Sequence, residues 1–223
     1  MESRVERRLA AILCADVVGY SRLIGRDEAG TVGALRSLRR DVIDPLLARH
    51  RGRLVQTTGD GTLVEFGSVV DAVQCAVALQ EAVVEREAAT SPELRLVLRI
   101  GVNLGEVVAD GADILGDGVN VAARLEQLCE PGGVLVSETV REHVGNRIDL
   151  AFEDIGPQAL KNIERPVRAH RLLLSGAQSS SVAIIAGPWR TRVERARPSV
   201  CWRSRTSAVI RSRIISAKAS PRT

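Results

Sequence analysis

Two aspartates of this chain stand where a β-strand is expected to end. Asp16 lies near the end of a continuous apolar run at residues 9–18, and Asp60 separates the Val-, Leu- and Thr-rich halves of LVQTTGDGTLVEF, residues 54–66. A carboxylate fixed at a strand end is a candidate ligand for Mg²⁺, which proteins usually hold through one or two carboxylates while substrate phosphates complete the octahedron. Each aspartate also has a purely structural explanation: Asp60 could only form a turn, and Asp16 could only accept hydrogen bonds from backbone amides.

A second candidate pair lies in DILGDGVNVAARLEQL, residues 113–128, where Asn120 and Arg124 are four residues apart. On a helix this spacing places both side chains on one face, so an amide and a guanidinium could reach the same ligand. A solvated polar face has the same spacing, and the spacing alone does not separate the two interpretations.

The elements that must position these side chains follow from the apolar pattern. Residues 9–18 predict a buried central strand, because the run is continuous rather than alternating. Residues 27–50 have apolar positions at helical spacing and predict an amphipathic helix that Pro45 kinks or divides near its last turn. Residues 54–66 predict a hairpin in which Asp60 and Gly61 form the turn, because both tolerate positive φ.

The second part of the chain continues the mixture of helices and strands. Ser68 is predicted to cap an amphipathic helix that reaches about Val83, and a third helix is predicted to begin at about Val119. Residues 94–108 predict a strand, with a second strand around 105–110. Shorter elements are predicted at 134–136 (strand), at 137–144 (helix), and around Phe152, Leu160 and 167–174 (closing strands), with Lys161 in a loop between two of these strands. This order predicts an α+β or α/β sandwich of a sheet and helices.

Composition indicates an ordinary water-soluble protein. The hydrophobic fraction is 45% and the charged fraction 26%, and no apolar run approaches the ~20 residues that a membrane-spanning helix needs. The first apolar run contains Asp16 and continues as a strand pattern, so we expect no cleavable signal. The cysteines show no C-x-x-C spacing, which predicts reduced, mostly buried thiols in a cytoplasmic protein; they are Cys14, Cys75, Cys129 and Cys201.

Charge divides the chain at about residue 175. Residues 175–223 contain ten of the 31 Lys and Arg residues and one of the 27 Asp and Glu residues, so the net charge of +4 separates into +9 for this segment and −5 for residues 1–174. We therefore predict a globular domain at 1–174 and a basic, disordered tail at 175–223. Nucleic-acid binding is not expected of the mildly acidic domain and would depend wholly on the tail.

Five segments, in the same order, resemble the catalytic domain of class III nucleotidyl cyclases, in the bacterial adenylate cyclase subgroup. They are CADVVGYSRL at 14–23, TTGDGTLVEF at 57–66, RIGVNLGEVV at 99–108, DILGDGVNVAARLE at 113–126 and LKNIERPV at 160–167. The resemblance covers about residues 8–174. It implies a ferredoxin-like α/β core, a mixed sheet with flanking helices, that pairs head to tail as a homodimer with active sites shared across the interface.

The resemblance also implies a role for each candidate residue. Asp16 and Asp60 match the aspartates that hold two Mg²⁺ or Mn²⁺ ions, which ionise the ribose 3′-hydroxyl and neutralise the triphosphate. Asn120 matches the residue that orients the ribose. Arg124 matches the arginine that stabilises charge on the α-phosphate in the transition state. These roles predict conversion of ATP to 3′,5′-cyclic AMP and pyrophosphate by in-line attack of the 3′-hydroxyl.

The residues that would read the purine base depart from the family pattern. Lys161 matches a lysine that contacts the outer phosphates, and Asp113 matches one of two base readers. The second reader, commonly a lysine four positions before the second metal aspartate, is replaced by Gln56. Its amide can still donate to adenine N1, with a weaker and uncharged contact, whereas the Asp113 carboxylate would face the guanine carbonyl oxygen. ATP is therefore expected over GTP, with reduced activity or relaxed base choice as alternatives.

Two further interpretations remain open at the level of sequence. The domain could be a catalytically weak cyclase homologue that binds nucleotide or dimerises to regulate a partner, because Gln56 departs from the pattern. The tail could be an out-of-frame remnant, because suitable codons for residues 201–220 read in a neighbouring frame as VLAFANLSGDPEQDYFSEGI, which resembles the segment that follows the cyclase domain in longer relatives.

Overall fold

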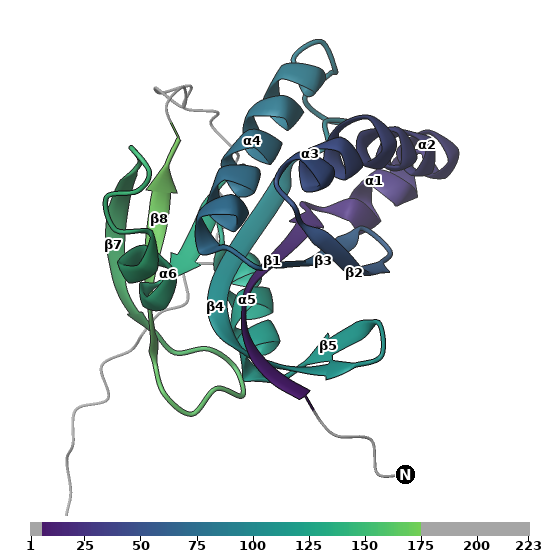
Figure 1. The fold of residues 1–223 in the computed structure, drawn as a ribbon. Helices are drawn as coiled ribbons and strands as arrows, with labels where there is room; N and C mark the ends of the chain where they lie inside the picture. The colour runs from purple at the N-terminus through teal and green to yellow at the C-terminus, as the bar shows by residue number, and fades with distance from the viewer. Residues whose placement is uncertain (1–5, 175–223) are drawn as a thin grey trace, which may run out of the picture. The chain divides into compact units, whose positions relative to one another are not determined.

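One eight-stranded sheet with helices on both faces organises residues 6–174, the part of the chain that the computed structural model describes (Figure 1). The tail predicted at 175–223 lies outside the described residues. The elements in chain order are β1 (Glu6–Val17), α1 (Tyr20–Arg26), α2 (Glu28–Leu38), η1 (Arg39–Ile43), α3 (Asp44–Arg49), β2 (Arg53–Thr58), β3 (Gly61–Phe66), α4 (Val69–Glu87), β4 (Leu98–Asp110), β5 (Asp113–Leu115), α5 (Asp117–Leu128), β6 (Val134–Ser137), α6 (Glu138–Val144), β7 (Ala151–Gln158) and β8 (Val167–Leu173).

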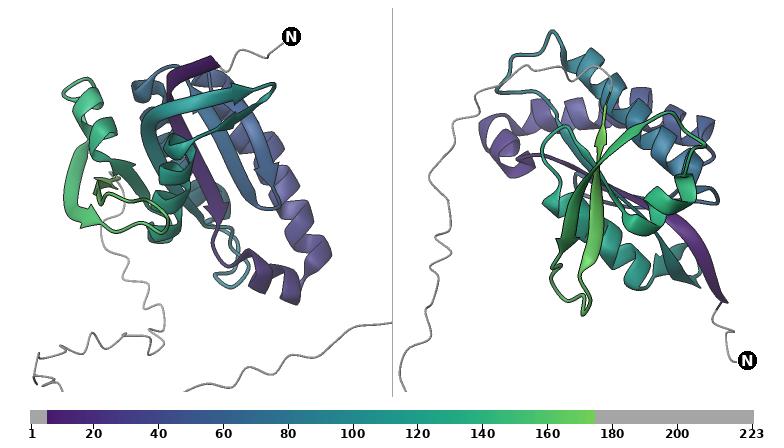
Figure 2. Two further views of the ribbon diagram at one scale, coloured as in Figure 1. Left: turned by 90° about the horizontal axis from the view of Figure 1, so that it is seen from below. Right: turned by 90° about the vertical axis from the view of Figure 1, so that its left-hand side faces the viewer.

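The strand order is β2-β3-β1-β4-β6-β8-β7, and β5 pairs with β4. The first four strands are joined in the sequence strand, helices, hairpin, helix, strand, and each pairs with its neighbours in antiparallel fashion. This is the ferredoxin-like arrangement. The later strands extend the same sheet, because β6 runs parallel to β4 and β8 antiparallel to β6. The predicted mixed sheet with flanking helices is therefore confirmed, and Figure 2 shows the β7–β8 hairpin at the end of the sheet opposite the β2–β3 hairpin.

Strand β1 is central and buried on both faces, which explains its continuous apolar sequence. Side chains alternate along a strand, so Leu13 and Ala15 pack in the cluster formed with α1–α4, whereas Ile12 and Cys14 pack in a second cluster with Ala122 of α5. Asp16 therefore points to the α5 face.

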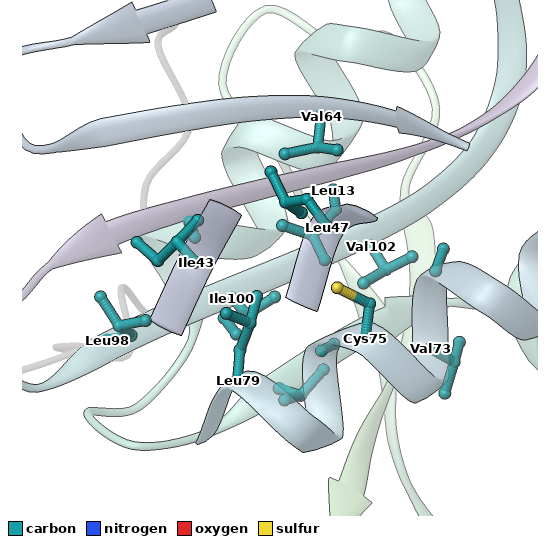
Figure 3. Close-up of a cluster of buried hydrophobic side chains, with 14 of the residues drawn as sticks. Leu13, Ile43, Leu47, Val64, Val73, Cys75, Leu79, Leu98, Ile100 and Val102 are labelled. Atoms are coloured by element: carbon teal, nitrogen blue, oxygen red, sulfur yellow. The ribbon is translucent and has the colours of Figure 1, made fainter. Parts of the chain in front are cut away.

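The larger core cluster fills the space between the sheet and the helices of the other face. Figure 3 shows Cys75 and Leu79 of α4 against Ile100 and Val102 of β4. Cys14, Cys75 and Cys129 are all buried free thiols, as the cysteine spacing predicted; Cys201 lies outside the described residues. Within residues 6–174, no helix combines the length and apolar character needed to cross a membrane.

The helix predicted at residues 27–50 forms in three segments. Asp27 caps α2, because its Oδ1 accepts a hydrogen bond from the Gly30 backbone N–H at 2.9 Å. The α-helical pattern widens to a π-helical turn over Arg39–Ile43 before Pro45, which stands in the first turn of α3. Proline has no N–H for the preceding turn and its ring crowds the carbonyl four residues earlier, so the predicted division by Pro45 is confirmed.

Other details of the sequence prediction were wrong. Helix α1 was not predicted. Residues 94–97 are not a strand, and the two strands expected within 94–110 are one strand, β4. Leu160 lies buried in the loop between β7 and β8 rather than in a strand. Short segments of this kind carry little periodicity, so tertiary packing decides their conformation.

Candidate active site

Asp16 and Asp60, which are distant in the sequence, line one cavity of about 330 Å³ between the β2–β3 hairpin, β1 and α5. Asp16 reaches it from the α5 face of β1, and Asp60 from the hairpin turn. Both side chains are partly buried. The sequence expectation that these carboxylates act together therefore agrees with where the fold places them.

The hairpin turn differs by one residue from the prediction. Thr58 pairs with Gly61, so the two-residue loop is Gly59-Asp60 rather than Asp60-Gly61. Gly59 supplies the positive φ, at 61°. A glycine with positive φ at the first loop position is typical of a type II′ hairpin turn. Because glycine takes that conformation, Asp60 keeps an ordinary backbone and carries its carboxylate into the cavity.

Arg99, which the sequence analysis did not single out, provides the positive charge beside Asp16. The two residues are direct partners in the β1–β4 ladder, and Arg99 Nη2 donates to Asp16 Oδ2 at 2.6 Å. The same nitrogen lies 3.3 Å from Glu126 Oε1 of α5. That second contact is an ion pair without hydrogen-bond geometry, because within residues 6–174 this buried oxygen has no hydrogen-bond partner.

The three carboxylates outnumber the single guanidinium, and the pKa values of Asp60 and Glu126 reflect this. The pKa of Asp60 is raised to about 6, first by burial and then by the hydrogen bond and charge of Asp16. The pKa of Glu126 is raised to about 7, mainly by burial and then by the charge of Asp16, while Arg99 opposes the shift. Burial and like charges both disfavour ionisation, so a bound cation would stabilise the ionised carboxylates.

These residues fit a divalent cation whose remaining ligands come from elsewhere. No group of three or more His, Cys, Asp and Glu side chains within the described part of the chain is arranged to hold a metal ion alone. Asp16 and Asp60 are nevertheless two partly buried carboxylates in one cavity. Such a pair is the donor set expected for Mg²⁺ or Mn²⁺ when substrate phosphates and water complete the coordination.

Glycines allow α5 to lie directly on β4 and thereby bring Glu126 to Arg99. A Cβ on Gly101 would lie 2.3 Å from the Ala122 carbonyl oxygen, and one on Gly105 would lie 2.9 Å from Cα of Gly118. Between these glycines, Asn103 Nδ2 donates to the Gly118 carbonyl at 3.0 Å. The two glycines of the motif RIGVNLG therefore leave room on β4 for the backbone of α5 to pack closely against it.

Asn120 and Arg124 lie outside the cavity that contains the two aspartates. The residues of α5 that line it are Val119, Ala123, Glu126 and Gln127. At about 100° per residue, Asn120 stands beside this set on the helix surface, and Arg124 is turned further from it. Arg124 instead donates from Nε to the Lys161 carbonyl at 3.3 Å and from Nη1 to Gln127 at 2.7 Å. Arg124 and Lys161 are thus neighbours, whereas one chain does not place them on the aspartates.

The two predicted base readers also lie apart. Gln56 lines the cavity with the aspartates. A β-bulge explains its direction: the β2–β3 register shifts between Leu54 and Gln56, so Val55 and Gln56 both face the α5 side. Asp113 is on β5, is not among the cavity residues, and accepts a hydrogen bond from the Ile114 backbone at 2.8 Å.

Two functional candidates were missed at the sequence level, Arg99 and Glu126. Arg99 could have been found from alternation, because it interrupts the apolar pattern of LRLVLRIGV on the strand that pairs with Asp16. Glu126 stands next to the predicted Arg124 face and gives no distinct signal in the sequence, since a glutamate on an amphipathic helix is usually solvated.

Comparison with known proteins places this chain in a family. The family model for the adenylate and guanylate cyclase catalytic domain matches residues 5–173, so the chain belongs to that family. A putative adenylate cyclase 3 of Rhizobium meliloti is 52% identical over 163 residues, which are 73% of this chain and 28% of that protein. An adenylate cyclase of Streptomyces coelicolor is 35% identical over 143 residues, 64% of this chain and 36% of that protein.

Among solved structures, an adenylate/guanylate cyclase/hydrolase from Silicibacter pomeroyi superposes with a TM-score of 0.73 at 44% sequence identity, covering 77% of this chain and all of that one. The chain thus spans about a third or less of the two curated relatives but the whole length of this solved domain. The similarity concerns the cyclase domain.

Proposed function

We propose that this chain is an adenylate cyclase domain that converts ATP to 3′,5′-cyclic AMP and pyrophosphate. The observation that carries the proposal is the convergence of Asp16 and Asp60 in one cavity of a cyclase fold. In the reaction, the ribose 3′-oxygen loses its proton and forms a bond to the α-phosphorus. The bond from the α-phosphorus to the bridging oxygen breaks, and pyrophosphate leaves with that electron pair.

The residues of the cavity would bind and orient the reacting groups. Asp16 and Asp60 would hold two Mg²⁺ or Mn²⁺ ions, which when bound supply charge neutralisation and lower the pKa of the attacking hydroxyl. Arg99 keeps the Asp16 carboxylate in place through the 2.6 Å hydrogen bond. This contact keeps Arg99 beside the site. Its guanidinium, which is always protonated, would attract phosphate groups there.

The remaining catalytic groups would come from a second copy of the chain. Asn120 would orient the ribose and Arg124 would stabilise the charge on the α-phosphate, but within one chain both lie outside the aspartate cavity. A head-to-tail homodimer brings the α5 face of one chain to the cavity of the other, and twofold symmetry would generate two equivalent sites. Lys161, which adjoins Arg124, would then contact the outer phosphates.

Base selection would depend on Gln56 and Asp113, with Asp113 as acceptor and the Gln56 amide as donor. Adenine presents a donor at its exocyclic amine and an acceptor at N1, which suits this pair. The contact from Gln56 is neutral, so ATP would be preferred over GTP by a smaller margin than a charged donor would give.

A product assay tests the proposal. Purified protein would be incubated with Mn²⁺ or Mg²⁺ and with ATP or GTP, and the product identified by mass. The proposal predicts cyclic AMP formation that requires metal and is slower with GTP as substrate. No cyclic product at a protein concentration where a dimer is demonstrated would refute it.

A second candidate is a regulatory module that binds nucleotide or dimerises with little catalysis. It is supported by Gln56 at a base-reading position and by the close ion pair of Asp16 with Arg99. Metal-dependent nucleotide binding without turnover in the same assay would favour this function.

A further inference from the structure

We propose that a second cavity, on the far side of the Gly59-Asp60 turn, binds a phosphate-bearing anion such as pyrophosphate. The cavity has a volume of about 310 Å³ and is formed by the α2–η1 helical segment, Tyr20 and Gly59. It shares no lining residue with the aspartate cavity. The proposal does not depend on the proposed cyclase reaction.

Three arginines on one side of the α2–η1 segment line this cavity: Arg36, Arg39 and Arg40. The only acidic side chain among the lining residues is Asp44. Arg40 is paired at 2.7 Å with Asp41, an exposed neighbour outside the cavity lining. Arginine is suited to phosphate because its planar guanidinium presents several donors in a fork that matches phosphate oxygens.

The guanidinium group of Arg39 gives the main support for this proposal. Its Nε and Nη2 atoms are buried and make no hydrogen bond to any part of the chain that the structure describes. Buried guanidinium nitrogens are normally paired, since a desolvated charge without a partner is costly. An anion in the cavity would supply the acceptor oxygens that the protein does not provide.

The sequence explains why an arginine is held in this position. Arg39 opens the π-helical turn that precedes Pro45. A π-helical turn adds a residue to the helical repeat and so rotates the side chains that precede it relative to those that follow; such turns are frequent at functional sites. Leu38, which precedes the turn, and Ile43, its last residue, are buried in the core and fix the helix against the sheet.

The size and position of the cavity suit a diphosphate better than a simple halide. At about 30 Å³ per water molecule in the liquid, its volume equals about ten waters, which is comparable with a diphosphate and part of its hydration. The ligand could be a free diphosphate or the phosphate tail of a nucleotide, because both present the same oxygens to the three arginines.

The test is a binding titration in EDTA, which prevents metal-dependent binding at the aspartates. Pyrophosphate, inorganic phosphate and ATP would each be titrated calorimetrically into the full chain and into the Arg39→Gln, Arg36→Gln and Arg49→Gln variants. Arg49 is exposed on α3 and does not line the cavity, so Arg49→Gln is a matched control for loss of one positive charge.

We expect pyrophosphate to bind at least about tenfold more weakly to Arg39→Gln and a few-fold more weakly to Arg36→Gln, with Arg49→Gln within about twofold of the parent chain. If ATP shows the same dependence on Arg39, the ligand is a nucleotide phosphate tail; if only pyrophosphate does, it is a free anion. Equal pyrophosphate affinity in the parent and Arg39→Gln, or no binding to the parent, overturns the proposal.

Thermal unfolding gives a second readout that a merely structural Arg39 would not produce. Pyrophosphate in EDTA should raise the melting temperature of the parent chain by mass action. Arg39→Met should remove that increase while itself unfolding at a higher temperature, because it replaces an unpaired buried charge. If the increase persists in Arg39→Met, the proposal is wrong. Should the Arg39 variants fail to fold, the exposed Arg36→Gln decides by the same criterion.

Discussion

The two predicted halves of the active site differ in how completely one chain builds them. Asp16 and Asp60 are partly buried and share a cavity that Glu126 also lines, and Arg99 forms ion pairs with Asp16 and Glu126. Asn120, in contrast, is exposed and is not among the residues that line that cavity. One chain therefore brings the charged side chains of the carboxylate half together. For the Asn120 half, it only fixes a position on α5.

This difference indicates which kind of partner each half of the site would need. Asp60 and Glu126 have raised pKa values because burial and repulsion between carboxylates oppose ionisation, and a bound cation would relieve both. The face with Asn120 and Arg124 has no such cluster of like charges, and in our proposal it acts on the cavity of a second chain. The same helix, α5, belongs to both halves, since Glu126 meets Arg99 while Arg124 adjoins Lys161.

Removing a carboxylate should have the largest effect on the first half. Asp60→Asn is expected to lower the rate of cyclic AMP formation by about 10³-fold, because the charge that binds the cation is lost. Mass detection of the product with Mn²⁺ would measure this. Asp149→Asn, at an exposed position outside the cavity, is the control and should retain full activity; a similar loss in both variants would contradict the assignment.

Separating α5 from β4 should disturb both halves together. A Cβ on Gly101 would lie 2.3 Å from backbone atoms of α5, so Gly101→Ala should lower the free energy of unfolding by about 1–3 kcal/mol and reduce activity. Denaturant unfolding would measure the loss. Gly33→Ala is the matched control, because no atom lies within 4 Å of its added Cβ, and it should stabilise α2 by about 0.5–1 kcal/mol. Equal stability of the two variants would contradict the close packing.

The pH dependence of stability sharpens the comparison further. In the metal-free folded protein the pKa of Asp60 is about 6, above its ordinary 3.8. The folded state therefore keeps a proton that the unfolded chain releases, and the free energy of unfolding falls as the pH rises from about 4 to about 6. Asp60→Asn should remove that part of the fall. In EDTA its melting temperature should exceed that of the parent by more at about pH 7.5 than at about pH 4.5; the same difference at both pH values would show that Asp60 is not perturbed.

The smallest expected effect concerns base choice. Gln56→Lys would replace a neutral donor in the cavity by a charged one, so the ratio of ATP to GTP turnover should rise by about five- to tenfold. Gln74→Lys, at an exposed position of α4, controls for the added charge and should leave the ratio unchanged. A ratio that does not move in Gln56→Lys would mean that this residue does not read the base.

Much of the fold was predictable because long periodic segments specify their own element and face. The continuous run of β1, the helical spacing around Pro45 and the hairpin at Asp60 all appear where expected. The turn was displaced by one residue, because either Gly59 or Gly61 could supply positive φ and only the strand register decides between them. Helix α1 has seven residues, too few to show a period.

The candidate site was less predictable than the fold, because its geometry arises between strands that are distant in the sequence. The pairing of Asp16 with Arg99 depends on the β1–β4 register, and the direction of Gln56 depends on a β-bulge at Val55. Neither feature has a local sequence signature. The roles of Asn120, Arg124 and Lys161 remain predictions, since they concern a second chain.

Mixing two inactive variants tests the shared site most directly. Asp16→Ala lacks a proposed metal ligand and Arg124→Ala lacks the arginine proposed to stabilise the transition state, so each homodimer should be inactive. Random reassortment of equal amounts should restore about one quarter of the parent activity, because half of the dimers are mixed and each mixed dimer contains one intact site of two. Such recovery is the result that we predict. No recovery in a mixture shown to contain the mixed dimer would contradict a site formed from two chains.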